Sequence, residues 1–218
     1  MNDAAIHPVI KILRRAVAAW RAPYVTALAQ QRRDPFRILI STMLSLRTKD
    51  AVTEAASQKL FALADNPHAM LKLTPHQIEQ AIYPVGFYRT KAKNILQVCR
   101  ELLARFDSQV PADLDALITL PGVGRKTANL VMTLGFALPG ICVDTHVHRI
   151  TNRWGYVQTQ TPAQTEMALR AKLPRAYWIE INDELVAFGQ NLCHPVSPKC
   201  SLCPLAKYCA RVGVTRSR

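Results

Sequence analysis

The sequence predicts an all-α protein, and three observations lead to that fold class. Apolar residues recur at intervals of three and four in segments 9–20 and 95–106, which is the spacing of a helix that buries one face. Two Thr-Pro pairs, at 74–75 and 161–162, have the form of a helix N-cap followed by proline at the first helical position. No stretch combines sustained alternation with the β-branched enrichment of strands.

The expected helices follow in chain order. The first covers 9–20, the next begins after Thr74, and a third covers 95–106. An apolar run at 130–134 directly follows a glycine turn, so we expect it to continue a helix that starts at that turn. A further helix begins after Thr161, where a glutamine three residues later completes a capping box.

Charge is the most informative feature of the composition. The 218-residue chain has 28 Lys and Arg against 15 Asp and Glu, a formal net charge of +13, and 49% hydrophobic residues, which is ample for a packed core. An anionic partner is therefore expected, nucleic acid first and an anionic membrane second. No apolar run approaches the ~20 residues that span a bilayer, and charges interrupt residues 1–20, unlike a signal peptide. We expect a cytoplasmic protein that does not act at a membrane.

The cysteines fall into two groups. Cys99 and Cys142 lie in apolar surroundings and are expected in the core, because cytosolic thiols rarely form disulfides. The other four lie within 17 residues in the pattern C-x6-C-x2-C-x5-C: Cys193, Cys200, Cys203 and Cys209. Four such thiols can each hold one iron of a 4Fe-4S cluster. A four-cysteine zinc site usually pairs two C-x-x-C knuckles and only one is present here, so zinc is disfavoured but stays open.

A glycine turn precedes the run at 130–134. Gly122 and Gly124 make a tight turn directly before a helical run, with Arg125 beside it, so backbone amides at the helix start can hold a phosphate of DNA. The alternative is an ordinary connection between two helices. A nucleotide-binding P-loop is excluded, because Arg125 separates Gly124 from Lys126.

Lys126 and Asp144 are the candidate catalytic residues. Lys126 comes two residues after the turn, where the helix dipole and Arg125 disfavour a charged amine and so favour a nucleophile. The alternative is a phosphate contact. Asp144 precedes an expected helix and is typical of an N-cap. Paired with a lysine, the same carboxylate can stabilise the oxocarbenium-like state that forms when a base leaves a sugar.

Three motifs together resemble the endonuclease III family. They are the segment LPGVGRKTAN at 120–129, VDTH at 143–146 and the cysteine pattern that ends at Cys209, in the family's order and spacing. The resemblance runs from about Pro35 to Cys209. It implies two helical domains that flank a DNA-binding cleft: a six-helix domain with a helix-hairpin-helix at 28–138, and an iron–sulfur cluster domain formed by 1–27 and 139–218.

The resemblance also implies an activity. The family members are bifunctional DNA N-glycosylases and AP lyases of base excision repair, which remove oxidised pyrimidines and cut the strand 3′ to the abasic site by β-elimination. Lys126 matches the nucleophile that forms a Schiff base at C1′ of the flipped nucleotide, and Asp144 the essential carboxylate. The four cysteines match the ligands of a 4Fe-4S cluster. The implied partner is double-stranded DNA with oxidised pyrimidines or abasic sites, bound by a monomer associated with a bacterial or archaeal nucleoid.

The resemblance departs at the wedge positions that fill the space left by a flipped base. Arg47 stands where many members have glutamine, and Phe87 where leucine is frequent. Arginine can stack on and hydrogen-bond an unpaired base, and phenylalanine can intercalate, so we expect flipping to survive, while the opposite-base preference is left open. The alternatives are a surface charge for Arg47 and core packing for Phe87. His146 matches a family histidine near a DNA phosphate; the alternative is a buried, hydrogen-bonded histidine. Lys199 lies in a loop that contacts phosphate in relatives, and Lys91 and Lys93 are further candidates for such contacts.

Three other functions are weighed against this one. An adenine-excising mismatch glycosylase typically lacks the lysine at position 126 and uses a glutamate near 46–50, where this chain has none. A monofunctional thymine-mismatch glycosylase is disfavoured by the same lysine. A non-catalytic helix-hairpin-helix module with zinc is the alternative from another class, and it would be colourless.

Overall fold

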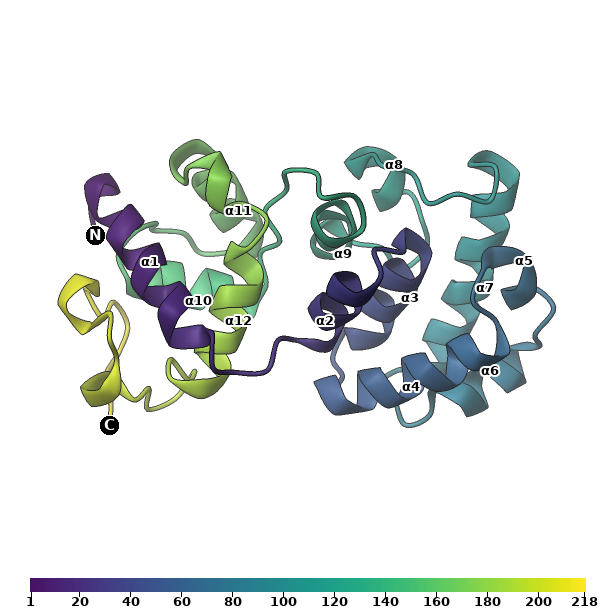
Figure 1. Ribbon diagram of the computed structural model, residues 1–218, viewed down its shortest axis with the longest axis horizontal. Helices are drawn as coiled ribbons and strands as arrows, with labels where there is room; N and C mark the ends of the chain where they lie inside the picture. Colours follow the sequence, from purple (N-terminus) through teal and green to yellow (C-terminus); the bar gives the residue numbers. More distant parts are fainter. The chain divides into compact units, whose positions relative to one another are not determined.

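The computed structural model describes all 218 residues, which form helices and connecting segments without a strand. The predicted all-α fold class is therefore confirmed. The chain divides into two compact units, one formed by Met1–Pro23 with Ile141–Arg218 and the other by Tyr24–Gly140 (Figure 1). The domain limits taken from the family resemblance, 28–138 for the first domain, stay a prediction.

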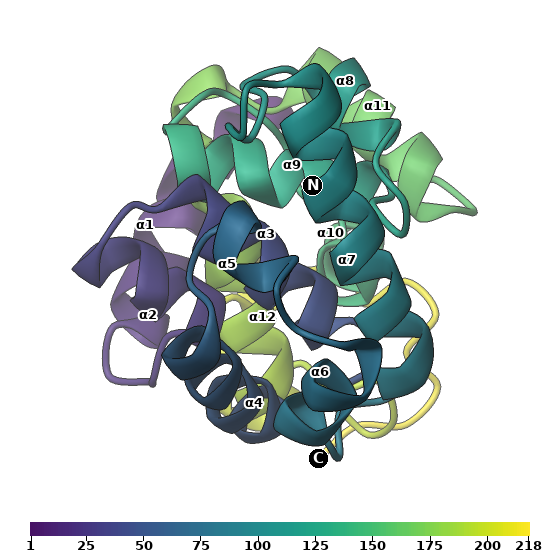
Figure 2. The ribbon, with the colours of Figure 1, turned by 90° about the vertical axis from the view of Figure 1, so that its right-hand side faces the viewer.

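The unit Tyr24–Gly140 is built around one buried helix. Its elements are α2 (Tyr24–Gln31), α3 (Pro35–Ser45), α4 (Asp50–Leu63), α5 (Pro67–Met70), α6 (Pro75–Ile82), α7 (Tyr88–Arg105), α8 (Leu114–Ile118), α9 (Arg125–Leu130) and the π-helical turn η2 (Val131–Gly135). Helix α3 packs against α2, α4, α7, α9 and η2, and Figure 2 shows it in the midst of them. Its residues Ile38 to Leu44 are buried without a break, so α3 is the core of this unit.

Local sequence signals set several of these helix boundaries. Thr74 caps α6, and its hydroxyl and the Gln77 side chain form a reciprocal capping box. The expected helix at 95–106 is the second half of α7. The run expected as an α-helix at 130–134 is instead mostly a π-helical turn. That wider turn packs against α3, and a Cβ added at Gly135 would be in ordinary van der Waals contact with Pro35.

The second unit joins the two ends of the chain around a common core. Its helices are α1 (Ile6–Val17), α10 (Thr145–Arg153), α11 (Pro162–Lys172) and α12 (Ile181–Asn191), with 3-10 turns η1 (Asp3–Ala5), η3 (Arg175–Tyr177), η4 (Cys200–Leu202) and η5 (Ala206–Tyr208). Helix α12 packs against both α1 and α10. The core residues of these helices include Leu13, Ile150 and Phe188, and Cys193, Cys203 and Cys209 pack against that core.

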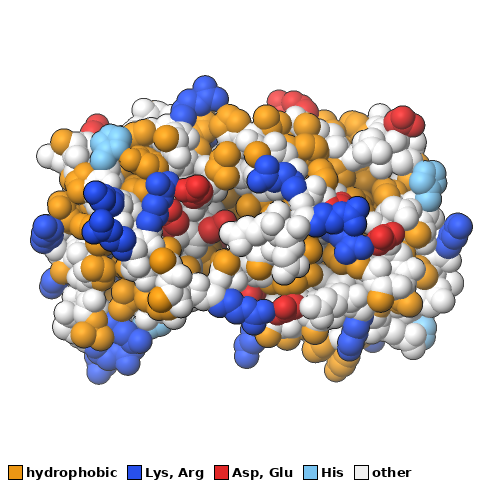
Figure 3. All heavy atoms as spheres, in the orientation of Figure 1, with side chains coloured by type: hydrophobic (Ala, Val, Ile, Leu, Met, Phe, Trp, Pro, Cys, Tyr) orange, Lys and Arg blue, Asp and Glu red, His pale blue; other side chains and the backbone are white.

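The surface of the chain is basic, as the composition requires. On the face drawn in Figure 3, Lys and Arg side chains lie on both units. None of the helices is both long and apolar enough to cross a bilayer.

Candidate catalytic residues and metal centre

The turn between α8 and α9 depends on Gly122. Its φ of +75° is a conformation that L residues rarely adopt, and an added Cβ would lie 2.6 Å from Asn94 Nδ2 on α7. Gly124 differs, because its φ of −91° suits any residue and a Cβ there would meet no atom within 4 Å. The turn therefore needs glycine at Gly122 for the fold, whereas Gly124 leaves open space in front of the start of α9.

Lys126 is the second residue of α9 and is exposed, as is Arg125 before it. Gly124 is the N-cap of α9 and has no side chain to cap the helix. The first turn of a helix carries amides that the helix itself does not use, with the positive end of its dipole. The hairpin thus presents an exposed amine beside a helix start that favours anions.

Asp144 is locked at the start of α10. One carboxylate oxygen, Oδ1, accepts hydrogen bonds from the backbone amides of His146 at 2.8 Å and Val147 at 2.9 Å. The expected N-cap is therefore confirmed, and it fixes the direction of a half-buried carboxylate.

His146 and Arg149 connect the start of α10 with the cysteine segment. The Arg149 guanidinium donates to the Cys193 carbonyl at 2.9 Å and lies 3.1 Å from His146 Nδ1. Because a guanidinium only donates, His146 Nδ1 accepts and the ring proton belongs on Nε2. Burial lowers the pKa of Arg149, and the Asp144 carboxylate acts in the opposite direction. Gly189 on α12 makes room for this ring, since a Cβ there would overlap it.

The two wedge candidates touch each other. The Arg47 guanidinium lies over the Phe87 ring at 5.5 Å from its centroid. Both residues have left-handed backbone conformations, with φ of 54° and 58°. Phe87 is 62% exposed, so the alternative that it belongs to the core is wrong.

Lys91 is buried, so the hypothesis that it contacts a DNA phosphate is wrong. The side chain is 7% exposed, and its Nζ donates to the Leu44 carbonyl at 2.8 Å, the Leu46 carbonyl at 2.6 Å and Thr48 Oγ1 at 3.3 Å. Burial lowers the pKa of Lys91 to about 8. Lys93, by contrast, is exposed.

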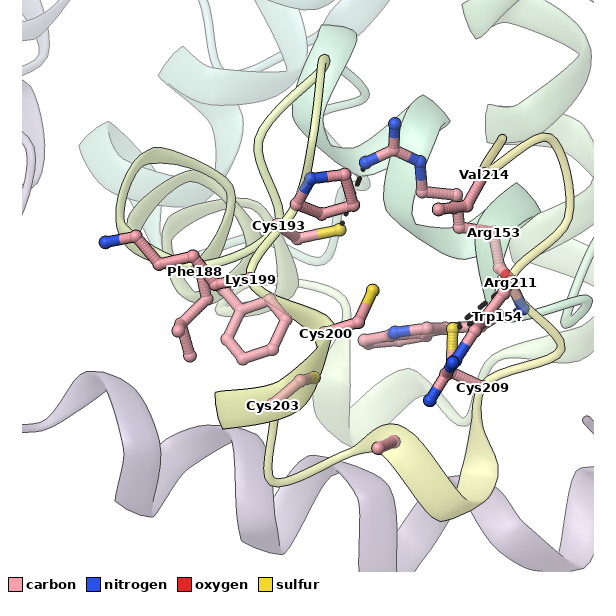
Figure 4. A pocket seen from close by; sticks show the side chains of 13 residues that line it. Arg153, Trp154, Phe188, Cys193, Lys199, Cys200, Cys203, Cys209, Arg211 and Val214 are labelled. Carbon is pink, nitrogen blue, oxygen red and sulfur yellow. Dashed lines mark hydrogen bonds between the residues drawn. The ribbon is translucent and has the colours of Figure 1, made fainter. Parts of the chain in front are cut away.

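The four clustered cysteines line one pocket that is partly open to solvent. Figure 4 shows their side chains around this space, together with Lys199 and Trp154. The expected core cysteines, Cys99 and Cys142, are indeed buried, away from this pocket. No three His, Cys, Asp or Glu side chains gather as ligands of a single ion. A 4Fe-4S cluster needs one thiolate for each of its four irons, and four thiols line this pocket.

Hydrogen-bond donors surround these sulfurs. Arg153 Nη1 lies 3.4 Å from Cys193 Sγ, and the Arg211 amide lies 3.4 Å from Cys209 Sγ. The same Arg153 side chain donates to the carbonyls of His194 and Pro195, both at 2.6 Å. Such donors favour thiolate, which is the form that binds iron. Burial raises the pKa of Cys203 and Cys209. A bound metal would act in the opposite direction, because it binds the thiolate form. The residues present therefore fit an iron–sulfur cluster.

Sequence reasoning missed Arg149 and Arg153. They stand one turn apart on α10, on the helix that Asp144 caps, and both donate to carbonyls in the segment 193–195. Their spacing of four residues was the available signal, but it is also that of any exposed basic helix face.

Comparison with known proteins identifies the family of this chain. The model of the HhH-GPD superfamily base excision DNA repair proteins matches residues 40–175, and that of the iron–sulfur binding domain of endonuclease III matches 193–209. Endonuclease III of Thermotoga maritima is 48% identical over 176 residues, which are 81% of this chain and 83% of that protein. Endonuclease III homolog 1 of Arabidopsis thaliana is 41% identical over 183 residues, which are 80% of this chain but only 48% of that longer protein.

A solved structure shares the fold over almost the whole length. It is that of a trapped endonuclease III–DNA covalent intermediate, with a TM-score of 0.87, 32% identity and 97% of each chain covered. The second family model decides between the two metal sites that the cysteine spacing left open, in favour of the 4Fe-4S cluster. The chain belongs to the endonuclease III family, the helix-hairpin-helix DNA glycosylases and AP lyases of base excision repair that carry an iron–sulfur cluster.

Proposed function

We propose that Lys126 is the nucleophile and Asp144 the essential carboxylate with which this glycosylase and AP lyase removes oxidised pyrimidines from duplex DNA. The observation that carries the proposal is the contrast between the two side chains. Lys126 stands exposed in the first turn of α9, while hydrogen bonds from two amides fix Asp144. A nucleophile must reach its target, whereas a charge that stabilises a cation must be held in place.

The reaction begins when the damaged nucleotide leaves the base stack, because C1′ is out of reach inside the duplex. The neutral Lys126 amine attacks C1′ and the bond from C1′ to the base breaks. The base departs with the electron pair and takes up the proton that the amine nitrogen loses. Asp144 stabilises the positive charge that develops on the sugar. The bond from C1′ to the ring oxygen O4′ then breaks, O4′ takes up a proton, and C1′ and the Lys126 nitrogen are left joined as a Schiff base. Loss of a proton from C2′ then expels the 3′ phosphate, and water releases the lysine.

We further propose DNA contacts at the start of α9, at His146 and at Lys199. Open space at Gly124 lets a phosphate approach the amides at the start of α9, beside Arg125, and Gly122 holds that turn in shape. The Nε2 proton of His146 is a suitable donor for a second phosphate. Lys199, in the loop before Cys200, adds a positive charge there.

The four clustered cysteines are proposed as the cluster ligands: Cys193, Cys200, Cys203 and Cys209. When bound, the cluster supplies a rigid cross-link between segments that otherwise have few buried residues. Arg153 then holds the first of these segments through its carbonyls. We also propose that the protein acts as a monomer on the nucleoid.

Borohydride reduction tests the chemistry directly. With DNA that carries an oxidised pyrimidine, borohydride should convert the Schiff base into a stable protein–DNA adduct, and peptide mapping should find the adduct on Lys126. Lys126→Gln should give no adduct and no strand cleavage, while its affinity for DNA with an abasic analogue stays within about threefold of the original. An adduct on another residue, or normal cleavage by Lys126→Gln, would refute the assignment.

A further inference from the structure

Two loops of the unit Tyr24–Gly140 are joined at a single hydroxyl. One is 46–49, between α3 and α4, and the other is 83–87, between α6 and α7. Thr48 Oγ1 accepts a hydrogen bond from the Gly86 amide at 3.1 Å and one from Lys91 Nζ at 3.3 Å. It donates to the Leu46 carbonyl at 3.3 Å. This hydroxyl therefore ties both loops to the first turn of α7.

Close packing of the backbones leaves little freedom at this junction. A Cβ added at Gly86 would lie 2.6 Å from the Arg47 carbonyl oxygen, so only glycine permits the approach. Each loop contributes one residue with positive φ at this junction, Arg47 from the first loop and Phe87 from the second, and their side chains stack on each other. The stacked pair thus rests on a junction with one defined geometry.

Lys91 supplies the charge at the centre of the junction. Its ammonium has three protons and makes three donations, two of them to carbonyls at the end of α3. The last carbonyls of a helix have no partner within the helix and carry the negative end of its dipole. A buried cation at that position is satisfied only if the 46–49 loop keeps this conformation.

We propose that Lys91 is a positioning residue that sets Arg47 and Phe87 as one preassembled stacked wedge before DNA binds. The inference rests on the proposed function and on the wedge role that the family resemblance implies for these two side chains. Ordering two loops and two long side chains at the moment of binding would weaken the complex, and Lys91 removes that cost in advance. Lys91 itself touches no DNA.

A wedge is needed only in a duplex, where it fills the space of the flipped nucleotide and contacts the opposite strand. An abasic site in a single strand presents the same C1′ to Lys126 but has no estranged base. The ratio of borohydride trapping rates on the duplex and on the single strand therefore reports the wedge separately from the chemistry. The iron-loaded full-length protein is used throughout.

Lys91→Met keeps the length of the side chain and removes its donors. We expect the duplex-to-single-strand ratio to fall about tenfold, with single-strand trapping unchanged. Lys72→Met, which replaces an exposed lysine of the same unit that lies outside both loops, should leave the ratio as it is. An unchanged ratio in Lys91→Met would overturn the inference.

Thr48→Val gives a second test that spares the buried charge. It removes the hydroxyl that joins the loops and leaves both carbonyl contacts of Lys91, so the ratio should fall in the same direction, by about threefold. If Lys91→Met does not fold, this variant decides, and an unchanged ratio refutes the proposal. Absence of trapping on both substrates by the original protein would instead refute the proposed function. An original ratio close to one would mean that there is no wedge to position.

Discussion

The Arg47 guanidinium lies 5.5 Å from the centre of the Phe87 ring, although the two residues are 40 positions apart and belong to different loops. Stacking of this kind gives the arginine a defined plane and direction. Because Arg47 only donates hydrogen bonds, an arginine held there favours an estranged base with paired acceptors, and guanine offers O6 and N7.

We therefore predict that Arg47 sets the preference for the base opposite the lesion. Arg47→Gln replaces a guanidinium that only donates by an amide that both donates and accepts. The ratio of the excision rate opposite guanine to that opposite adenine should therefore fall about fivefold to tenfold. The measurement is single-turnover excision of one oxidised pyrimidine placed opposite each of the four bases. Affinity for undamaged duplex serves as the control and should change little. The same order of rates in both proteins would contradict the prediction.

The two glycines of the hairpin are predicted to fail in different ways. Gly122→Ala forces a Cβ into a left-handed conformation and against Asn94, so the free energy of unfolding should fall by about 1–2 kcal/mol. Gly124→Ala meets no protein atom and should cost less than about 1 kcal/mol, yet it should weaken DNA binding about tenfold by blocking the phosphate. Urea unfolding and DNA titration of both variants check this pair. Equal effects on stability would show that Gly124 is merely structural.

Asp144 has a structural and a chemical role that substitution can separate. Asparagine also caps helices well, so Asp144→Asn should retain the free energy of unfolding to within about 0.5 kcal/mol, whereas Asp144→Ala should lose about 1 kcal/mol. Both variants lack the negative charge, and base excision should slow by about 100-fold or more in each. Denaturation and single-turnover excision measure the two quantities. Normal excision by Asp144→Asn would show that the negative charge of Asp144 is not needed for the reaction.

The cysteine assignment predicts a clear contrast between ligand and core thiols. Cys203→Ser should lower the iron content below four per chain and weaken the broad absorption near about 400 nm, because the pocket loses one thiolate. Cys99→Ala removes a buried thiol from the other unit and should leave iron content and colour unchanged. Iron analysis of protein prepared without oxygen provides the measurement. A colourless protein loaded with zinc would contradict the cluster.

Local signals were sufficient for much of the fold and for the reacting groups. The caps at Thr74 and Thr161 depend on residues three positions away, so the sequence alone predicts them. The cysteine spacing and the Asp144 cap are local in the same sense. The contacts of Lys91 are different, because its three acceptors lie more than 40 residues earlier in the chain.

Tertiary packing explains what could not be predicted. Lys91 follows a polar stretch at the start of α7, so the sequence pattern is that of an exposed lysine. It is buried only because residues 44–48, which are distant in the sequence, pack against it. Arg149 was missed for the same reason, since its acceptor at Cys193 is brought close by the packing of α10 on α12. Buried charges of this kind are decided by partners that periodicity does not register.

Lys91 also predicts a pH dependence. Burial lowers its pKa to about 8, below the ordinary value of 10.5, and no charged side chain contributes to that shift. Between pH 8 and 10.5 the unfolded chain binds the proton more readily than the folded one, so this group makes the fold more stable, not less, as pH rises through that window. The hydrogen bonds that hold the two loops become fewer over the same pH range. A neutral amine has only two protons, so Lys91 must give up one of its three donations.

The duplex-to-single-strand trapping ratio should therefore fall between pH 7 and pH 9, while the contribution of Lys91 to the free energy of unfolding does not. The chemical step at Lys126 is common to both substrates and therefore divides out of the ratio. In Lys91→Met the ratio should be low and independent of pH across the same range. Trapping measured at half-unit steps, with urea unfolding at each pH, provides the check. A ratio in the original protein that stays constant to pH 9 would show that the charge on Lys91 does not hold the loops.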